Sequence, residues 1–268
     1  MTTPQTYAIT GVASGIGAEL AQLLKSSGHR VIGFDLTDAS DSVDRYIPLD
    51  LNDPVSIAQA ATALDEPVDG LCNNAGVPPI PDAEVLTLQV NFLGQRDFTQ
   101  RVFPRISAGG AIVNMASRAG HSWMDNIDQV KRLAAVSDSD ALPDFVAREG
   151  IDATRCYNLS KEAMILWTQA MTEPLFAQDL RAVSLSPGGI STGILDDFHR
   201  AFGDKVARNI ERTGRPGRPD EVAQIAAFVL SRAAYWMKGI DIPIDGGMGA
   251  FNLSDRLGLE VFLSGAPD

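Results

Sequence analysis

The sequence predicts one α/β domain built on a parallel sheet, and two observations carry this prediction. Short apolar segments alternate with helical segments from residue 6 to residue 245, which is the pattern of parallel strands joined by crossover helices. The chain has 268 residues, of which 45% are hydrophobic, and this is enough to bury a substantial core. Because no linker, repeat or low-complexity tract divides the sequence, we expect residues 1–268 to form a single domain.

The first predicted element is a short strand over residues 7–10, followed by a glycine-rich turn and a helix over residues 18–26. In the turn, Gly11, Gly15 and Gly17 lack the Cβ atoms that would keep a pyrophosphate away from the backbone. The helix N-terminus adds free N–H groups and the positive end of a dipole. This predicts a dinucleotide site of the Rossmann type, although the spacing departs from GxGxxG and a glycine turn without a ligand would look the same.

The second predicted strand, residues 29–35, ends in Asp35, where a dinucleotide-binding acid accepts hydrogen bonds from the adenine-ribose hydroxyls. A third apolar run, residues 46–49, leads to Asp50 and Leu51, which we assign to the adenine edge. A 2′-phosphate would meet a like charge at Asp35. No arginine or lysine to hold that phosphate stands at the neighbouring positions Ser14, Leu36 and Thr37. The sequence therefore favours NAD as the cofactor, while a simple loop acid at Asp35 is the alternative.

Tyr157 and Lys161 are four residues apart, so a helix places the phenol and the ammonium on one face. A fixed cation favours phenolate over phenol, so we expect Lys161 to lower the pKa of Tyr157 from its usual value near 10. A tyrosine of that kind can remove the proton of an alcohol. By itself, the spacing also fits an ordinary exposed helix pair.

Composition restricts the partners. The formal charge of −12 and the pI near 4.6 disfavour nucleic acid and anionic lipid, which require basic patches. Two cysteines cannot make a disulfide framework, and no signal peptide or long apolar run is present, so we expect a cytoplasmic protein outside membranes. Three histidines and two cysteines show no zinc spacing, so we expect no metal.

Ordered motifs run along nearly the whole chain. They are Thr10-Gly11-x3-Gly15-x-Gly17, Asn73-Asn74-Ala75-Gly76, Asn91, Ser117, Tyr157-x3-Lys161, Pro187-Gly188 and Asp245-Gly246-Gly247. With these motifs the sequence resembles the short-chain dehydrogenase/reductase superfamily. The resemblance implies a single-domain Rossmann fold with a seven-stranded parallel sheet flanked by helices. It also implies a nicotinamide cofactor, a small alcohol or carbonyl substrate and a homodimer or homotetramer.

The resemblance implies four catalytic residues. Tyr157 would be the acid/base, and Lys161 would lower its pKa and hold the nicotinamide ribose. Ser117 would hydrogen-bond the substrate oxygen, and Asn91 would hold a water that links the lysine to solvent. From the residues alone, Ser117 also fits a buried strand-end serine, and Asn91 fits a polar residue that bends its helix.

The same resemblance assigns the cofactor site to the glycine turn, the two acidic strand ends, the Asn-Asn-Ala-Gly turn, the catalytic pair and the segment after Pro187, where Thr192 would orient the nicotinamide amide. The assigned residues are Gly11, Ser14, Gly15, Ile16, Gly17, Asp35, Leu36, Asp50, Leu51, Asn74, Ala75, Gly76, Tyr157, Lys161, Pro187, Gly188, Ile190 and Thr192.

The chain between Ser117 and Tyr157 is much longer than is usual in the family, and we predict an insert at about residues 121–153. Two short helices, over residues 126–135 and 142–149, are expected within it. Because the insert joins the two catalytic elements, it should emerge near the active-site mouth. Trp123 and Met124 are candidates for substrate contact, with packing of the insert against the body as the alternative.

A second candidate region for substrate contact is the segment at about residues 190–213, where the family places a substrate lid. Its apolar residues recur at roughly helical spacing, which a core-facing amphipathic helix would also produce. With Ser117 and Gly188, two of these residues complete the predicted substrate contacts, namely Leu195 and Phe198.

Further similarity favours the branch that contains bacterial coniferyl-alcohol dehydrogenase and 3α-hydroxysteroid dehydrogenase/carbonyl reductase. It implies NAD-dependent oxidation of a primary or secondary alcohol to an aldehyde or ketone, with an aromatic or allylic alcohol slightly favoured over a hydroxysteroid. The alternative from another class is a non-catalytic NAD-binding regulator, which the complete catalytic set opposes.

Overall fold

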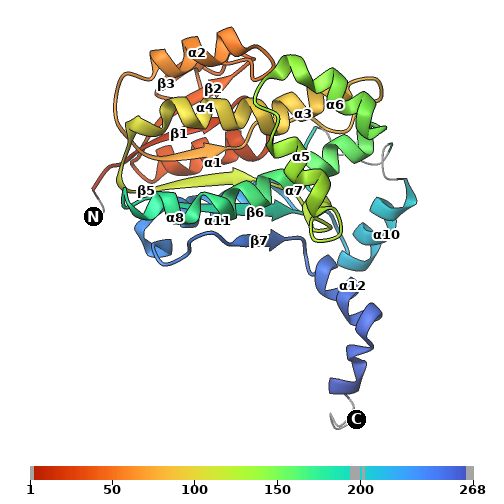
Figure 1. Ribbon diagram of the computed structural model, residues 1–268. Helices are drawn as coiled ribbons and strands as arrows, with labels where there is room; N and C mark the ends of the chain where they lie inside the picture. Colours follow the sequence, from red (N-terminus) through yellow and green to blue (C-terminus); the bar gives the residue numbers. More distant parts are fainter. Residues whose placement is uncertain (1–2, 194–199, 201–202, 264–268) are drawn as a thin grey trace.

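A computed structural model describes residues 3–193, 200 and 203–263 of the chain. Within them, seven parallel strands form one sheet in the order β3-β2-β1-β4-β5-β6-β7 (Figure 1). This confirms the predicted seven-stranded parallel sheet flanked by helices. The strands are β1 (Thr6–Thr10), β2 (Arg30–Asp35), β3 (Arg45–Pro48), β4 (Val68–Asn73), β5 (Ile106–Met115), β6 (Arg181–Pro187) and β7 (Asp241–Ile244).

The helices connect these strands and cover both faces of the sheet. The α-helices are α1 (Gly15–Ser26), α2 (Pro54–Ala63), α3 (Glu84–Leu88), α4 (Gly94–Val102), α5 (Ile127–Ala134), α6 (Leu142–Glu149), α7 (Ala153–Ala170), α8 (Thr172–Phe176), α10 (Asp204–Thr213), α11 (Pro219–Leu230) and α12 (Met248–Leu257). The π-helix η1 (Gln89–Leu93) joins α3 to α4, and the 3₁₀ turns are η2 (Phe103–Arg105), η3 (Arg118–Gly120), η4 (Ser139–Ala141), η5 (Arg232–Ala234) and η6 (Leu259–Leu263).

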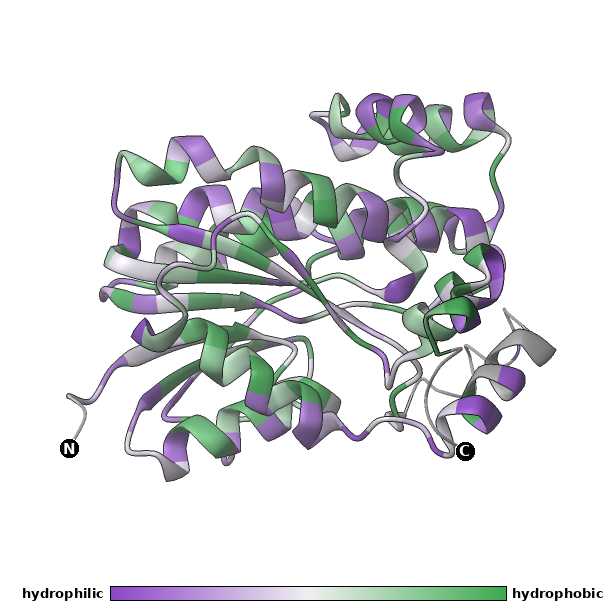
Figure 2. Cartoon of the chain, turned by 90° about the horizontal axis from the view of Figure 1, so that it is seen from below, coloured by the Kyte–Doolittle hydropathy of each residue, from purple (hydrophilic) through white to green (hydrophobic). Residues whose placement is uncertain are grey.

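Alternation along the strands builds a core on each face of the sheet. Ile9 belongs to one buried cluster, with residues of α1 and α11, whereas its neighbour Ala8 belongs to a second cluster, with residues of α2 and α4. Successive strand side chains point to opposite faces, so the two clusters lie on either side of the sheet. The strands are largely apolar in Figure 2, as expected for a sheet covered on both faces.

The strand order places a ligand crevice beside β1. β1 pairs with β2 on one side and with β4 on the other. The connection after β1 therefore leads toward one edge of the sheet, and the connection after β4 leads toward the other edge. In open α/β sheets, ligands bind at the carboxyl ends of the strands at such a reversal.

The long connection between β5 and α7 carries its own small core. Its two helices, α5 and α6, correspond to the two short helices expected in the insert. Val130 and Leu133 of α5 and Phe145 of α6 are buried against apolar residues of α7 in a third cluster. The insert therefore packs directly on the helix that carries Tyr157 and Lys161.

At the C-terminal end, α12 projects from the body of the protein (Figure 1), and none of its residues is buried. Across the described part of the chain, no helix combines the length and apolar character that a membrane span requires.

Candidate active site

Helix α7 presents the predicted catalytic pair to the interior. Asp152 caps its N-terminus by accepting a 2.7 Å hydrogen bond from the backbone N–H of Arg155, which fixes where the helix begins. Tyr157 and Lys161 are 5% and 6% exposed. Lys161 Nζ lies 5.7 Å from the centre of the Tyr157 ring, so the expected one-face arrangement is present and buried.

Ser117 meets this pair from the end of β5. It has an extended backbone and leads into the turn η3, and its Oγ accepts a 3.2 Å hydrogen bond from Ala119 N. The side chains of Ser117 and Tyr157 are hydrogen-bonded to each other. Two hydroxyls from separate elements thus converge at the carboxyl edge of the sheet.

Asn91 lies in the π-helix η1, which is a common place for functional residues. Its side chain accepts from Val77 N at 2.8 Å and donates to Val77 O at 2.9 Å. A Cβ on Gly76 would lie 3.0 Å from Asn91 Oδ1 and 3.7 Å from Lys161 Nζ. Only a glycine therefore leaves the space between this asparagine and this lysine open.

The expected lowering of the Tyr157 pKa is wrong for the protein by itself. Burial raises the pKa of Tyr157 to about 12, and the hydrogen bond with Ser117 opposes this only in part. Burial also lowers the pKa of Lys161 to about 8. The Lys161 ammonium donates to Met115 O at 3.0 Å and stays 5.7 Å from the ring centre of Tyr157, so desolvation outweighs its attraction for a phenolate.

The glycine turn has the shape of a phosphate cradle. Gly11 has φ +75°, and a Cβ there would lie 2.8 Å from Ala75 Cα. A Cβ on Gly17 would lie 1.9 Å from Gly11 O, so Gly17 lets the first turn of α1 pack under the loop. Gly15 also has a positive φ, and Ser14 leads into α1 with an extended backbone. The residues therefore fit a pyrophosphate at a helix N-terminus.

Asp35, at the end of β2, is fixed beside this turn. Its carboxylate accepts 2.9 Å hydrogen bonds from Ala13 N and Thr37 N. A dinucleotide whose phosphates lie at the turn would reach this acid with its adenine ribose.

A cavity of about 960 Å³ joins these parts. It is lined by Ser117, Tyr157, Lys161 and all but one of the predicted cofactor residues, namely Gly11, Ser14, Gly15, Ile16, Asp35, Leu36, Asp50, Leu51, Asn74, Ala75, Gly76, Pro187, Gly188, Ile190 and Thr192. Gly17 and Asn91 are buried and do not line the cavity. In the described part of the chain, no cluster of histidine, cysteine, aspartate and glutamate could hold a metal ion.

The proposed substrate contacts from the insert do not line this cavity. Trp123 packs against the third apolar cluster, which is the alternative that the sequence left open. Met124 is 68% exposed. Leu195 and Phe198 lie outside the described residues.

The cavity also has lining residues to which the sequence assigned no role. Among them are Leu86, Val90, Arg118, Asp245 and Met248. Two of these had a sequence signal without an assigned role, because Arg118 directly follows Ser117 and Asp245 begins the Asp-Gly-Gly motif.

Comparisons with known proteins agree with this geometry. A family profile described as short chain dehydrogenase matches residues 5–127, and one described as enoyl-(acyl carrier protein) reductase matches residues 143–249. The chain is 37% identical to a coniferyl-alcohol dehydrogenase of a Pseudomonas species over 244 residues, which cover 90% of this chain and 95% of the relative. It is 26% identical to a 3-alpha-hydroxysteroid dehydrogenase/carbonyl reductase of Comamonas testosteroni over 249 residues, with coverages of 90% and 95%.

A solved structure is similar throughout. The 3-alpha-hydroxysteroid dehydrogenase of a Pseudomonas species, crystallised with NADH, superposes with a TM-score of 0.82 at 28% identity and covers 92% of this chain and 98% of its own.

Proposed function

The chain belongs to the short-chain dehydrogenase/reductase family of oxidoreductases, and from that premise we propose that it oxidises an alcohol with NAD through Tyr157, Lys161, Ser117 and Asn91. The observation that carries this proposal is the convergence of Ser117 with the buried Tyr157 and Lys161 in the lining of one cavity. A nicotinamide cofactor, when bound, supplies the hydride acceptor.

In this proposal, Ser117 holds the substrate oxygen, and Tyr157 takes the hydroxyl proton. Because the Tyr157 pKa is about 12, the tyrosine keeps its proton at neutral pH and serves equally as the proton donor for carbonyl reduction. The ammonium of Lys161, which is protonated below a pKa of about 8, favours the phenolate that oxidation requires. Asn91 fixes the backbone of Val77 beside the lysine, and Gly76 leaves the space between Asn91 and Lys161 open.

Similarity supports the substrate class. The 37% identity to a coniferyl-alcohol dehydrogenase favours an aromatic or allylic alcohol, and the similarity to 3-alpha-hydroxysteroid dehydrogenases makes a hydroxysteroid the second candidate. We place the protein in a reducing cytoplasm, where its two buried cysteines remain free thiols, as a homodimer or homotetramer. Light scattering of the purified protein tests the oligomer.

Tyr157→Phe tests the catalytic assignment. Loss of the proton-transfer oxygen should lower turnover about 10²- to 10⁴-fold while NAD binding stays nearly unchanged. NADH absorbance with coniferyl alcohol, benzylic alcohols and 3α-hydroxysteroids measures turnover, and calorimetry measures binding. Turnover close to wild type would reject Tyr157, and NAD binding without turnover of any alcohol by the wild-type protein would favour a non-catalytic regulator.

Asp35→Ala tests the cofactor. Removing the carboxylate deletes acceptors for the ribose hydroxyls and the charge that repels a 2′-phosphate, so the preference for NAD over NADP should fall about tenfold or more. The ratio of the two dissociation constants is the measurement, because loosening of the turn at Ala13 weakens both cofactors alike. An unchanged ratio would contradict the ribose role.

A further inference from the structure

The cavity wall next to Ser117 contains an ion pair that the proposed reaction does not use. Arg118 Nε lies 2.9 Å from Asp245 Oδ2, and the two side chains are 19% and 8% exposed. Both residues line the cavity that also holds Ser117 and Tyr157. Removing charges from water is costly, so an ion pair that is largely covered in a cavity wall indicates a specific role.

This pair is held firmly in place. Asp245 accepts hydrogen bonds from Gly247 N at 3.0 Å and from Gly249 N at 2.8 Å. The guanidinium lies against Gly249, where a Cβ would approach Arg118 Cζ to 2.9 Å. On the other side, a Cβ on Gly188 would lie 3.1 Å from Asp245 Cα. The pair is thus packed tightly, with Asp245 against Gly188 and Arg118 against Gly249.

A second group of side chains supports the arginine. Arg118 Nη1 contacts His121 Nδ1, and His121 Nε2 lies 2.9 Å from Asp241 Oδ2. Asp241 in turn accepts hydrogen bonds from Ser184 Oγ at 2.6 Å and from Ser186 Oγ at 2.8 Å. The guanidinium is therefore oriented from two directions, as a preorganised binding group must be.

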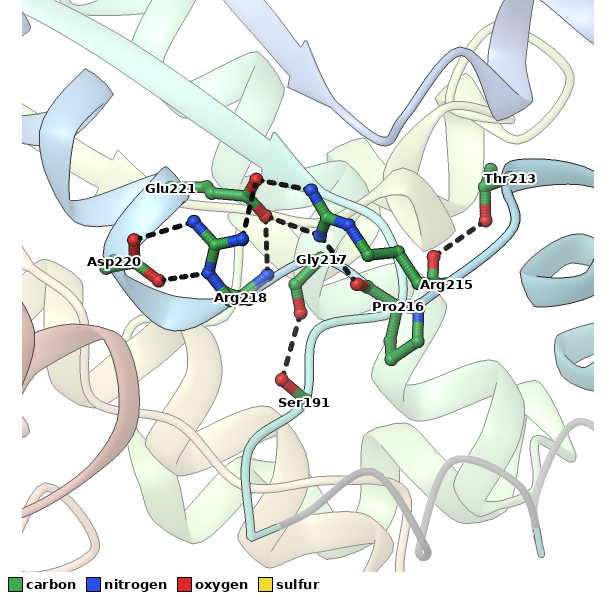
Figure 3. Close-up of polar contacts among 8 residues, drawn as sticks. All are labelled: Ser191, Thr213, Arg215, Pro216, Gly217, Arg218, Asp220 and Glu221. Carbon is green, nitrogen blue, oxygen red and sulfur yellow. Dashed lines mark hydrogen bonds and ion pairs between the residues drawn. The ribbon is translucent and has the colours of Figure 1, made fainter.

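Another ion pair in the cavity lining shows the contrast. Arg215 and Glu221, drawn in Figure 3, have side chains that are 54% and 32% exposed. Both carboxylate oxygens of Glu221 accept from Arg215, at 2.6 and 2.8 Å, and one also accepts from Arg218 N at 2.8 Å. The hydrogen-bonding capacity of Glu221 is used by Arg215 and by the backbone at the N-terminus of α11. The Arg118–Asp245 pair, in contrast, keeps hydrogen-bond donors and acceptors in reserve.

That reserve consists of unused N–H groups on Arg118 and an unused acceptor site on Asp245. A guanidinium has five N–H groups. Arg118 Nε lies beside Asp245 Oδ2 but makes no hydrogen bond, and Nη1 contacts His121 Nδ1. Nη2 has no protein acceptor in the described part of the chain. Asp245 Oδ1 accepts only from Gly247 N there, although a carboxylate oxygen has about two lone-pair sites. A hydroxyl group, which both accepts and donates, matches such a pair.

We propose that Arg118 and Asp245 form a polar subsite that binds a hydroxyl group of the substrate other than the one that reacts. The proposal rests on the alcohol-dehydrogenase function above and narrows its favoured class, an aromatic or allylic alcohol, to one that carries a second hydroxyl group. A carboxylate fits less well, because Asp241 and Asp245 together outweigh the charge of Arg118.

The experiment compares kcat/KM for 3- and 4-hydroxybenzyl alcohol with kcat/KM for benzyl alcohol. In wild-type protein we expect the better of the two phenols to be preferred about 10- to 100-fold, because an unpaired polar site discriminates against a substrate that lacks the matching group. Arg118→Met keeps an unbranched apolar stem and removes the donors, so the ratio should fall toward one, chiefly through KM of the phenol. Arg215→Met, at the exposed pair of the same cavity, is the matched control and should keep the ratio.

Two kinetic results would overturn the subsite. One is an unchanged ratio in Arg118→Met, and the other is an equal loss for both substrates, which would point to a structural role. If wild-type protein oxidises none of these alcohols, the proposed reaction fails separately, and calorimetry of the NADH complex with phenol and anisole decides the subsite. Tighter binding of phenol that Arg118→Met abolishes would support it, and equal binding of phenol and anisole would overturn it.

Discussion

Lys161 and Glu162 are neighbours on helix α7, both are buried, and the protein treats their charges in opposite ways. Glu162 is fully covered and receives two hydrogen bonds from Arg155, at 2.9 and 2.6 Å. Asn126, which precedes α5, adds a third at 3.0 Å. This side of α7 is an ion pair tied to the insert.

Lys161 has no carboxylate partner within the described residues. Its ammonium donates to the Met115 carbonyl oxygen, and burial lowers its pKa from 10.5 to about 8. Such a shift corresponds to roughly 3 kcal/mol of unfavourable desolvation of the charged form. The comparison indicates that α7 separates two tasks, because a satisfied charge fixes the helix and an unsatisfied charge remains available for chemistry.

Removing Arg155 from its ion pair with Glu162 should have the largest effect on stability. Arg155→Met leaves the Glu162 carboxylate buried with only Asn126 as a donor, so the free energy of unfolding should fall by about 3 to 5 kcal/mol. Denaturant unfolding measures this loss.

The double variant Arg155→Met/Glu162→Gln is the control for that interpretation, because it removes the stranded charge. It should recover most of the lost stability. If the single variant is as stable as wild type, the ion pair is not what holds the insert to α7.

Replacing Lys161 should instead raise the free energy of unfolding. Lys161→Met removes the desolvation penalty but also the hydrogen bond to Met115, so we expect a gain of about 1 to 3 kcal/mol at pH 7 together with loss of turnover. In wild-type protein the unfolded lysine binds more protons than the folded one between pH 8 and 10.5, so the penalty disappears as the pH rises through that window. The advantage of the variant should therefore be full at pH 7 and absent near pH 10.5. A variant less stable than wild type at pH 7 would contradict the comparison.

Much of this architecture could be predicted from the sequence, because local rules decide it. The glycine turn, the acid at Asp35 and the spacing of Tyr157 and Lys161 each express a backbone or periodicity constraint that short segments carry by themselves. The seven-stranded parallel sheet came with the family resemblance, and the order of its strands was not predicted. The two helices of the insert were visible as apolar periodicity between polar loops.

What the sequence missed depends on contacts between distant segments. The pKa of Tyr157 rises because several elements bury it, and its spacing from Lys161 says nothing about that desolvation. Arg118 and Asp245 are far apart in the sequence and meet only because β5 and β7 end at the same edge of the sheet. Trp123 was a candidate for substrate contact because of its large apolar area, and that area packs against the third cluster instead.

Met124→Ala should have the smallest effect on stability and on KM. It tests whether the insert contributes to substrate binding or only to the packing of α7. If the insert acts through Glu162 and its own core, then a side chain that is 68% exposed and absent from the cavity lining contributes little. We expect unfolding free energy within about 0.5 kcal/mol of wild type and KM values for the alcohol panel within about twofold. Trp123→Ala is the matched control, since it empties part of the third cluster and should cost about 1 to 3 kcal/mol. A KM that rises severalfold in Met124→Ala with unchanged stability would instead assign the insert a direct part in substrate binding.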